Sequence, residues 1–447
     1  MLYRPFADHL DKVAPEDLAR LADVHEGWYV EYKREMIVNR ELAKSLSSFA
    51  NQYGGWLFLG VEEDTVYNVA AAFPGIPNAE LQTALDSVRN AAKDLLQPPP
   101  FYNVKVFPGP IEAIGLREGF SIIVVHIPEG PDCPYVHNDG RIYMRVGDSS
   151  QPKYVTDRAT FDLLSQRGQE ARSRLNERVM WSPVTSKGEE NQPFIHMSIL
   201  SDPYEVMGHW YDRGFEGFAE AMKGFGIPFD NIFSTHNGFV ARQVGRNDAN
   251  KRVFTWHFSR NCHSFVTIPI PTLSLNRANP LWREYSIGNN FVSGLLDTDL
   301  IYCRVLDLNV AMDLVGHVVR RHRILASGAN VNGPFFLKAC LENVWRTIPF
   351  LDHSKYLEHV SNFGYPLVQE TDMVVPDGTA LDTFVVAPEL AVPPREGDLV
   401  SGAGPVELAM RIFDALGIPM VVLARSVDEL HSASKRSQEV QRKMMNG

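Results

Sequence analysis

The segment from Glu26 to Val61 constrains the fold of this chain more than any other. Apolar and polar residues alternate from Trp28 to Lys33, as they do in a strand with one buried face. A helical pattern covers Asn39–Asn51, and Gly54-Gly55 then lets the chain reverse at low steric cost. The run Trp56–Val61 is apolar on both faces, which is typical of a central strand covered by other layers. The sequence therefore predicts two strands joined by a helix, with the second strand inside a sheet.

Length and composition bound the number of domains. A chain of 447 residues is too long for one ordinary domain, and its 45% hydrophobic residues are ample for real cores. We expect a helical segment at 1–22, a mixed sheet with helices at 23–175, a linker at 176–193 and a second domain of unknown role at 194–447. The linker is placed where polar sequence with Pro and Gly lacks periodicity. The expected fold class is α+β for the first domain and mixed α/β for the second.

Apolar runs and helical periodicity mark further elements along the chain. Strands are expected at Phe120–Ile127 and Phe194–Leu200, which are both almost wholly apolar. A helix is expected from Thr156 to Gln166. A long apolar helix, or a pair of helices, is expected from Asp299 to Ala326.

The cysteines and the hydropathy pattern bear on the cellular compartment. The four cysteines lie far apart without a CxxC pair, which argues against a zinc ribbon and against a disulfide scaffold. The chain has no apolar run of about eighteen residues, so no membrane span is expected. The N-terminus also lacks the apolar core of a signal peptide. A reduced, cytoplasmic protein with no membrane partner is the simplest prediction.

The net charge of -11 argues against nucleic acid as a partner, because phosphate binding depends on cationic surface. This objection is weak, since an acidic site that holds a metal supplies its own positive charge. Basic residues also cluster locally, although such clusters are commonly solvated faces. The two clusters are Lys33, Arg34, Arg40 and Lys44, and Arg141, Arg145, Lys153 and Arg158.

Acidic residues gather at the ends of the two predicted strands. Glu26 and Glu31 lie five residues apart, so a regular strand points them to opposite faces unless Gly27 bends the chain. Glu63 lies just past the second strand and can approach Glu31 if the two strands pair. Lys33 shares a face with Glu31, where a lysine can steady a hydroxide or a phosphate. Acids collected in this way are what metal-assisted phosphodiester hydrolysis requires.

An all-oxygen site of this kind suits Mg²⁺ or Mn²⁺, which would polarise the phosphate and lower the pKa of an attacking water. The residues alone leave plainer alternatives open. A Glu beside a Lys on an exposed strand is commonly a surface pair worth less than about 1 kcal/mol. Likewise, Glu62-Glu63-Asp64 at a strand end is commonly a solvated turn.

Three segments together resemble the Schlafen AlbA-type domain over about residues 23–170. They are EYK at 31–33, SSFANQYGGWLFLGVEED at 47–64 and GRIYMRVGDSSQPK at 140–153. Members of this family are known as DNA- or ATP-binding modules and, in Schlafen proteins proper, as metal-dependent endoribonucleases that cut tRNA and rRNA. The FAN-x-x-GG motif followed by GV is the most specific part of the resemblance.

The resemblance implies roles for individual residues. Three acids carry the family's nuclease site, and the matching positions here are Glu26, Glu31 and Glu63, which would also bind the metal, with Lys33 beside them. The third acid is Glu where the family usually has Asp, so Glu62 or Asp64 could take its place. Arg145 could hold phosphate or, alternatively, brace the sheet through a buried carboxylate. The residues assigned to nucleic-acid binding are Arg34, Arg40, Arg145 and Lys153.

The resulting hypothesis is a metal-dependent endoribonuclease that cleaves structured RNA such as tRNA, with a role in phage defence by association only. Vertebrate members pair two lobes in one chain, whereas this chain has one copy, so a homodimer is expected. The main alternative is a non-catalytic DNA- or RNA-binding regulator with a C-terminal sensing domain. A scaffold without a nucleic-acid partner is a third possibility, which the negative charge favours.

Overall fold

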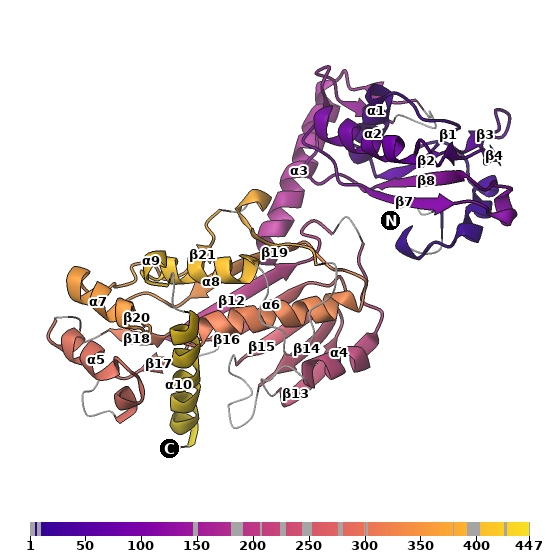
Figure 1. Cartoon of the computed structure of the whole chain (residues 1–447). Helices are drawn as coiled ribbons and strands as arrows, with labels where there is room; N and C mark the ends of the chain where they lie inside the picture. The colour runs from indigo at the N-terminus through magenta and orange to yellow at the C-terminus, as the bar shows by residue number, and fades with distance from the viewer. Residues whose placement is uncertain are drawn as a thin grey trace. The chain divides into compact units, whose positions relative to one another are not determined.

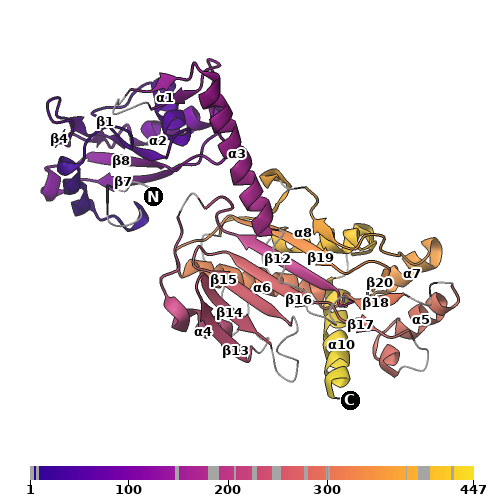
Figure 2. The ribbon, with the colours of Figure 1, turned by 180° about the vertical axis from the view of Figure 1, so that it is seen from behind.

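The computed structural model describes residues 5–6, 10–145, 151–179, 191–205, 208–223, 229–243, 253–275, 280–298, 300, 303–378, 380–390, 403–423 and 427–446. The chain forms two compact units (Figures 1 and 2). The first unit comprises Met1–Leu175 and Val206–Gly208, and the second comprises Asn176–Glu205 and His209–Gly447. Most of the predicted linker, at 180–190, lies outside the described residues.

The division between the units falls within helix α3 (Arg158–Val179), which is longer than the predicted helix at 156–166. The sequence from Arg167 to Val179 is rich in Arg and Glu, which are strong helix formers, and it contains no proline. Gly168 does not end the helix. A Cβ at this position would lie 2.4 Å from the carbonyl oxygen of Cys133, so the glycine permits close packing instead.

The first unit is built on a mixed five-stranded sheet, as predicted. Strand β1 (Val30–Lys33) forms one edge and runs parallel to β2 (Gly55–Leu59). Strand β8 (Phe120–Ile127) is antiparallel to β2 and to β7 (Asn103–Pro108). The short β5 (Ile76–Pro77) pairs with the beginning of β8.

Layers cover both faces of this sheet. Helices α1 (Asn39–Ala50) and α2 (Leu81–Asp94) pack on one face, where Leu57 of β2 belongs to the buried cluster. The N-terminal segment, which was predicted to be helical, forms a 3₁₀ helix at Pro15–Asp23 and packs with Phe58 on the opposite face. Every residue of β2 is buried, so the prediction of a covered central strand is confirmed.

Short elements complete the first unit. They are 3₁₀ turns at Leu10–Lys12 and Glu112–Ile114, and β3 (Glu62–Glu63), β4 (Ala70–Ala72), β6 (Leu96–Gln97), β9 (Val136–His137), β10 (Tyr143–Met144) and β11 (Lys153–Tyr154).

The second unit contains an eight-stranded sheet whose described pairings are all antiparallel. Its strand order is β13-β14-β15-β16-β12-β19-β21, and β22 also pairs with β19. The strands are β12 (Phe194–Leu200), β13 (Asn231–Thr235), β14 (Gly238–Arg242), β15 (Thr255–Ser259), β16 (Ser264–Pro269), β19 (Phe335–Glu342), β21 (Met373–Val375) and β22 (Val385–Ala387).

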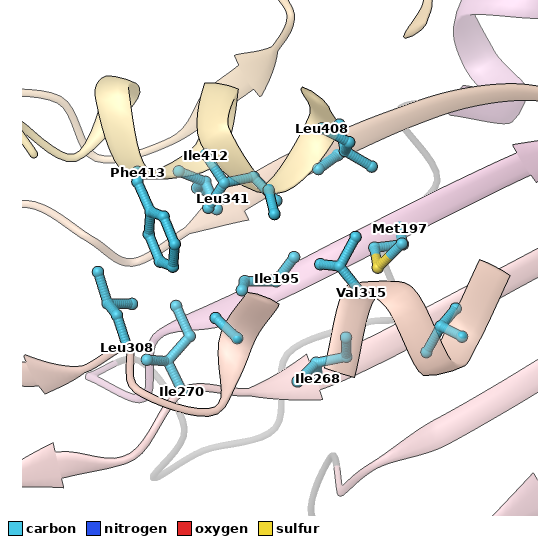
Figure 3. Close-up of a cluster of buried hydrophobic side chains, with 14 of the residues drawn as sticks. Ile195, Met197, Ile268, Ile270, Leu308, Val315, Leu341, Leu408, Ile412 and Phe413 are labelled. Carbon is cyan, nitrogen blue, oxygen red and sulfur yellow. The ribbon is translucent and has the colours of Figure 1, made fainter. Parts of the chain in front are cut away.

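Helices pack on one face of this sheet. Figure 3 shows Val315 of α6 and Phe413 of α8 directed toward Ile195 of β12, within the largest apolar core. The second unit as described contains the helices α4 (Gly214–Lys223), α5 (Gly288–Leu296), α6 (Ala311–Ser327), α7 (Ser354–Phe363), α8 (Ala403–Ala415), α9 (Met420–Leu423) and α10 (Val427–Asn446), with 3₁₀ turns at Pro280–Glu284 and Leu381–Thr383.

A small three-stranded sheet lies in the same unit, in the order β17 (Thr272–Leu273), β18 (Arg304–Asp307), β20 (Thr347–Phe350). Strand β18 corrects the prediction of helix throughout 299–326, because Arg304–Asp307 is extended and the helix begins only at Ala311. A short apolar run fits a buried strand and a buried helix equally well, and periodicity alone cannot separate them.

Helix α10 is held against the ends of β18 and β20 by hydrogen bonds to two buried aspartates. Asp307 Oδ2 accepts from Ser437 Oγ, and Asp352 Oδ2 accepts from Arg436 Nε, each at 2.6 Å. Asp352 also accepts from two backbone N–H groups. Across the part of the chain that the structure describes, no helix is both long enough and apolar enough to span a membrane.

Candidate functional site: an acidic cluster at the edge of the first sheet

A turn just before β1 brings Glu26 alongside the edge of the sheet. The N–H of Gly27 donates to the carbonyl of Val30 at 3.0 Å, and the N–H of Glu26 donates to the carbonyl of Asn68 at 2.6 Å. The Glu26 Oε2 atom then accepts a hydrogen bond from the N–H of Tyr32 at 2.9 Å. The bend that the acidic site requires is therefore present.

Glycine is not what makes this bend possible. The backbone of Gly27 is not left-handed, and a Cβ added there would meet no atom within 4 Å. The turn depends instead on its hydrogen bonds, which any residue at this position can form.

The Glu31 carboxylate is buried and has three hydrogen-bonding partners. Its Oε1 accepts from Ser45 Oγ at 3.0 Å and lies 2.9 Å from Lys33 Nζ. Its Oε2 is paired with Arg145, whose guanidinium also donates to the Gly27 carbonyl. Arg145 is only 1% exposed. This burial favours the structural alternative for Arg145 over phosphate binding, because a side chain enclosed in the fold cannot meet a ligand.

The three acids after β2 have different surroundings. Glu62 pairs with Arg34 at 2.6 Å. Asp64 accepts hydrogen bonds from the N–H groups of Tyr67 and Val66, which hold the pKa of Asp64 below its usual value. Among the residues that the structure describes, none forms a hydrogen bond or ion pair with the Glu63 carboxylate. Glu63 is thus the acid of the three that remains available.

Glu26 lies within electrostatic range of both other predicted acids. Burial raises the pKa of Glu26, and the negative charges of Glu63 and Glu31 raise it further. The hydrogen bond from Tyr32 and the charge of Lys33 oppose this shift without cancelling it. The edge of the sheet therefore gathers carboxylates whose mutual repulsion would be relieved by a bound cation.

The residues fit a divalent cation only in part. Within the described ranges, no group of three or more His, Cys, Asp and Glu side chains is arranged to hold a metal ion. Glu31 already has two cationic partners, which leaves Glu26 and Glu63 as the available oxygen ligands. Mg²⁺ is commonly bound through one or two carboxylates together with substrate phosphates. The donor set thus fits an ion shared with a substrate better than an ion enclosed by three protein acids.

Basic and aromatic side chains form a connected surface near the start of α1 and the β10–β11 hairpin. Arg40 pairs with Asp139 at 3.3 Å, and Asp139 also accepts a hydrogen bond from Tyr143. Tyr154, which is 52% exposed, is the cross-strand neighbour of Tyr143. We call this surface the basic-aromatic patch; it comprises Arg40, Lys44, Arg141, Lys153 and Tyr154.

Contacts within the patch place cations beside aromatic rings. The Arg141 guanidinium lies 4.9 Å from the ring centroid of Tyr154, and Lys44 Nζ lies 5.7 Å from that of Tyr143. Lys153 is exposed on β11. Arg40 belongs to this connected set through Asp139 and Tyr143, whereas Arg34 lies next to the acids through its pair with Glu62.

Sequence reasoning missed Ser45, Tyr154 and the N–H of Tyr32 as parts of this region. A signal for Ser45 exists, because Ser45, Ser47 and Ser48 follow one another in a helix and would leave polar groups on its buried side. No comparable signal identifies a backbone N–H at a sheet edge.

Comparison with solved structures shows only weak similarity. The N-terminal domain of a putative ATP-dependent DNA helicase RecG-related protein from Nitrosomonas europaea is 22% identical, with a TM-score of 0.23, over 33% of this chain and 96% of that chain. The DIP2311 protein from Corynebacterium diphtheriae is 15% identical, with a TM-score of 0.20, over 44% of this chain and 29% of that chain. None of the curated proteins compared with the chain matches it.

A family model does match the first unit. Residues 26–154 match the model described as "Schlafen, AlbA_2", and this range contains the acidic cluster and both strands of the β10–β11 hairpin. The predicted Schlafen AlbA-type domain is therefore confirmed. Residues 26–154 of this chain form a domain of the Schlafen, AlbA_2 family.

Proposed function

We propose that the first unit is a metal-dependent endoribonuclease of the Schlafen type that acts on structured RNA such as tRNA. The family match indicates a function related to nucleic acid. The observation that carries the catalytic part is the crowding of Glu26, Glu63 and Glu31, which helps to raise the pKa of Glu26. Like charges held together at a cost in stability are typical of sites that bind a cation or a proton.

Glu26 and Glu63 would hold Mg²⁺ or Mn²⁺ together with a phosphate of the substrate. When bound, such an ion polarises the phosphate and lowers the pKa of a water molecule. Lys33 supplies a positive charge at the same edge, and its Nζ is fixed by Glu31 at 2.9 Å. Glu31 acts as a positioning residue, because Arg145 and Ser45 hold it in place while it orients Lys33.

The surfaces around the acids suit RNA. Unpaired bases stack on exposed aromatic rings, and Tyr154 offers such a ring with Arg141 beside it. Tyr67 offers a second ring, since it is 69% exposed on the turn that Asp64 fixes next to Glu63.

A specific observation also favours a second candidate, a non-catalytic regulator that binds RNA or DNA. Arg145 forms an ion pair with Glu31. This pair leaves only two of the three expected acids available to bind a metal ion. In this case the basic-aromatic patch binds nucleic acid, and the acids serve only to fold the sheet edge.

The test is cleavage of total tRNA by the purified protein with Mg²⁺, with Mn²⁺ or with a chelator. We expect cleavage only with metal, and we expect Glu26→Gln and Glu63→Gln each to lower its rate by about a hundredfold or more. Glu62→Gln is the matched control, because it removes a neighbouring carboxylate that is already paired with Arg34.

The outcomes separate the candidates. Binding of tRNA or single-stranded DNA without cleavage supports the regulator. Absence of both binding and cleavage overturns both candidates and leaves a scaffold. Equal loss of cleavage in Glu62→Gln would show that the general charge of the edge matters, rather than the two named acids.

The proposal includes a homodimer, because a single Schlafen-type lobe needs a second copy to form a two-lobed groove. A measurement of molar mass by light scattering after size-exclusion chromatography tests this part. A monomer at working concentration would contradict it while leaving the cleavage assay unaffected.

A further inference from the structure

A cavity of about 770 Å³ lies in the second unit, where the turns of two β-hairpins meet. One side is lined by residues 235–239, where β13 turns into β14, and another by residues 257–261 and 263, where β15 turns toward β16. Gly238 permits the close approach, since a Cβ there would lie 2.1 Å from the carbonyl oxygen of Phe258. We call this space the hairpin cavity. Its volume falls within the range of small-molecule sites, which is roughly 300–1,000 Å³.

The lining of the hairpin cavity carries an excess of positive charge in a chain of net charge -11. Two arginines and one glutamate are among its residues. The glutamate, Glu205, is fully used: Arg178 Nη2 lies 2.9 Å from it, Asn261 Nδ2 donates to it at 3.0 Å, and His263 Nε2 lies 3.6 Å away. These partners, His263 first, lower the pKa of Glu205 to about 2, so it stays ionised and bound to them.

Arg260 is the second arginine of the lining, and unlike Arg178 it has no carboxylate partner among the described residues. Its guanidinium lies 5.7 Å from the ring centroid of Trp210 and 5.2 Å from that of Phe239. No carboxylate of the described chain pairs with it. A guanidinium between aromatic rings keeps its fork of N–H donors free for an anion, and phosphate is the anion that this fork matches best.

Trp210 gives the site its second feature. It lines the cavity and is 52% exposed, although large aromatic side chains are costly to leave in water. A planar base can stack on such a ring, and stacking of this kind contributes about 1–3 kcal/mol per base.

His257 adds a hydrogen-bonding group to the lining. Burial, helped by the charge of Arg242, lowers the pKa of His257 to about 4. Near neutral pH it is therefore uncharged and adds no positive charge to the lining.

We infer that the hairpin cavity binds a nucleoside phosphate, with the base on Trp210 and the phosphate on Arg260. The ligand is either a free nucleotide or the phosphorylated end of an RNA strand, since both present the same chemistry. This site does not depend on the proposed nuclease activity, because every residue that lines it belongs to the second unit.

The experiment is isothermal titration of the full chain with AMP, with adenosine and with a short 5′-phosphorylated oligoadenylate. The protein carries Glu26→Gln, so that cleavage at the first unit does not consume the oligonucleotide. We expect binding of AMP, of the oligoadenylate or of both, and binding of adenosine weaker by at least about fivefold. Binding of AMP identifies a free nucleotide as a sufficient ligand, and binding of the oligoadenylate alone identifies a strand end.

Two variants and a matched control locate the binding. Trp210→Ala and Arg260→Met should each weaken it by at least about fivefold. The control pair has the same chemistry outside the cavity: Trp345 is 49% exposed, with the Arg346 guanidinium 4.9 Å from its ring. Trp345→Ala and Arg346→Met should leave binding unchanged.

Three outcomes would overturn the inference: no binding of either phosphorylated probe, equal binding of adenosine, or unchanged binding in both cavity variants. Circular dichroism shows whether each variant is folded, and Arg260→Lys provides a second variant that keeps the charge but loses the planar fork. Absence of metal-dependent tRNA cleavage by the parent protein, with AMP binding retained, would refute the nuclease and leave this site standing.

Discussion

Each unit has a cluster of carboxylates at a sheet edge or strand end, and the two clusters differ in how many hydrogen-bond donors surround them. In the second unit, Asp352 accepts from Ser286 N–H at 3.0 Å, from Ile287 N–H at 2.9 Å and from Arg436 at 2.6 Å. In the first unit, Glu26 has one backbone donor and faces the charge of Glu63. The hydrogen-bonding capacity of Asp352 is therefore filled by groups of the protein, whereas that of Glu26 is not.

This contrast separates a structural acid from a functional candidate. Fully hydrogen-bonded aspartates tie α10 to the small sheet and need no ligand. Carboxylates that repel one another at the edge of β1 are tolerated only if something else is gained. Buried charge alone does not mark a site, because Glu31 is buried as well and is locked by Arg145. The informative property is whether the negative charge of a carboxylate is matched by hydrogen-bond donors and cations of the protein.

Removal of Arg145 should give the largest effect. Arg145→Met leaves the buried Glu31 with Lys33 and Ser45 only, and we expect the free energy of unfolding of the first unit to fall by about 3–5 kcal/mol. Urea denaturation measures this loss. The double variant Arg145→Met/Glu31→Gln should recover part of it, because the unpaired charge is gone. If the single variant is as stable as the parent, the ion pair between Arg145 and Glu31 does not stabilise the fold.

The equivalent change in the second unit should cost less. Arg436→Met removes a charged hydrogen bond worth about 1.5–3 kcal/mol, but Asp352 keeps its two backbone donors. Urea denaturation of this variant, followed by fluorescence of the second unit, checks the value. A loss larger than that of Arg145→Met would reverse the ranking of the two clusters.

The pH dependence of stability should have opposite signs at two glutamates. The pKa of Glu26 is raised in the folded state, so its contribution to stability is present below its usual pKa and is lost as the pH rises through the folded pKa. The pKa of Glu205 is lowered to about 2, so its contribution is present above its usual pKa and is lost as the pH falls toward 2.

Melting temperatures of Glu26→Gln and Glu205→Gln between pH 3 and pH 7 test these signs against the parent. Relative to the parent, Glu26→Gln should gain stability as the pH rises, whereas Glu205→Gln should gain it as the pH falls. Parallel curves for the two variants would remove the distinction between a strained and a satisfied glutamate.

The smallest effects are expected at the basic-aromatic patch. Lys153→Ala should weaken tRNA binding modestly and lower the slope of log affinity against log salt by about one, as for a single phosphate contact. Tyr154→Ala should weaken tRNA binding by about 1 kcal/mol, the lower end of the range for stacking of one base. The salt slope should not change, because stacking releases no counterions. Arg117→Ala, at a turn outside the patch, is the control. Identical salt slopes in all three variants would argue against phosphate contacts at Lys153.

The sequence predicts those parts of the molecule that depend on local pattern. Strands β8 and β12 have the same bounds in the structure as in the prediction, because each is an apolar run of seven or eight residues with polar sequence, Gly or Pro on both sides. The strand at Arg304–Asp307 was missed, since a run of four residues is too short to show a period.

The candidate site could be predicted in its composition but not in its partners. Glu26, Glu31 and Glu63 stand out by their positions beside strands. The pairing of Glu31 with Arg145 joins residues 114 positions apart, and such a contact follows from the tertiary fold rather than from spacing. The same holds for Trp210, which precedes α4, and Arg260, which follows β15, because only the tertiary fold brings them to one cavity.

The hydrogen bond from Tyr32 to Glu26 has a consequence for how copies of this protein behave at high concentration. Strand β1 is the last strand of its sheet, and an outer strand with open N–H groups can recruit a strand from another molecule. The Glu26 side chain covers one of these groups with a negative charge, which disfavours such recruitment. The acid proposed for catalysis thus also protects solubility, and Glu26→Ala should scatter more light than Glu63→Ala in concentrated solution.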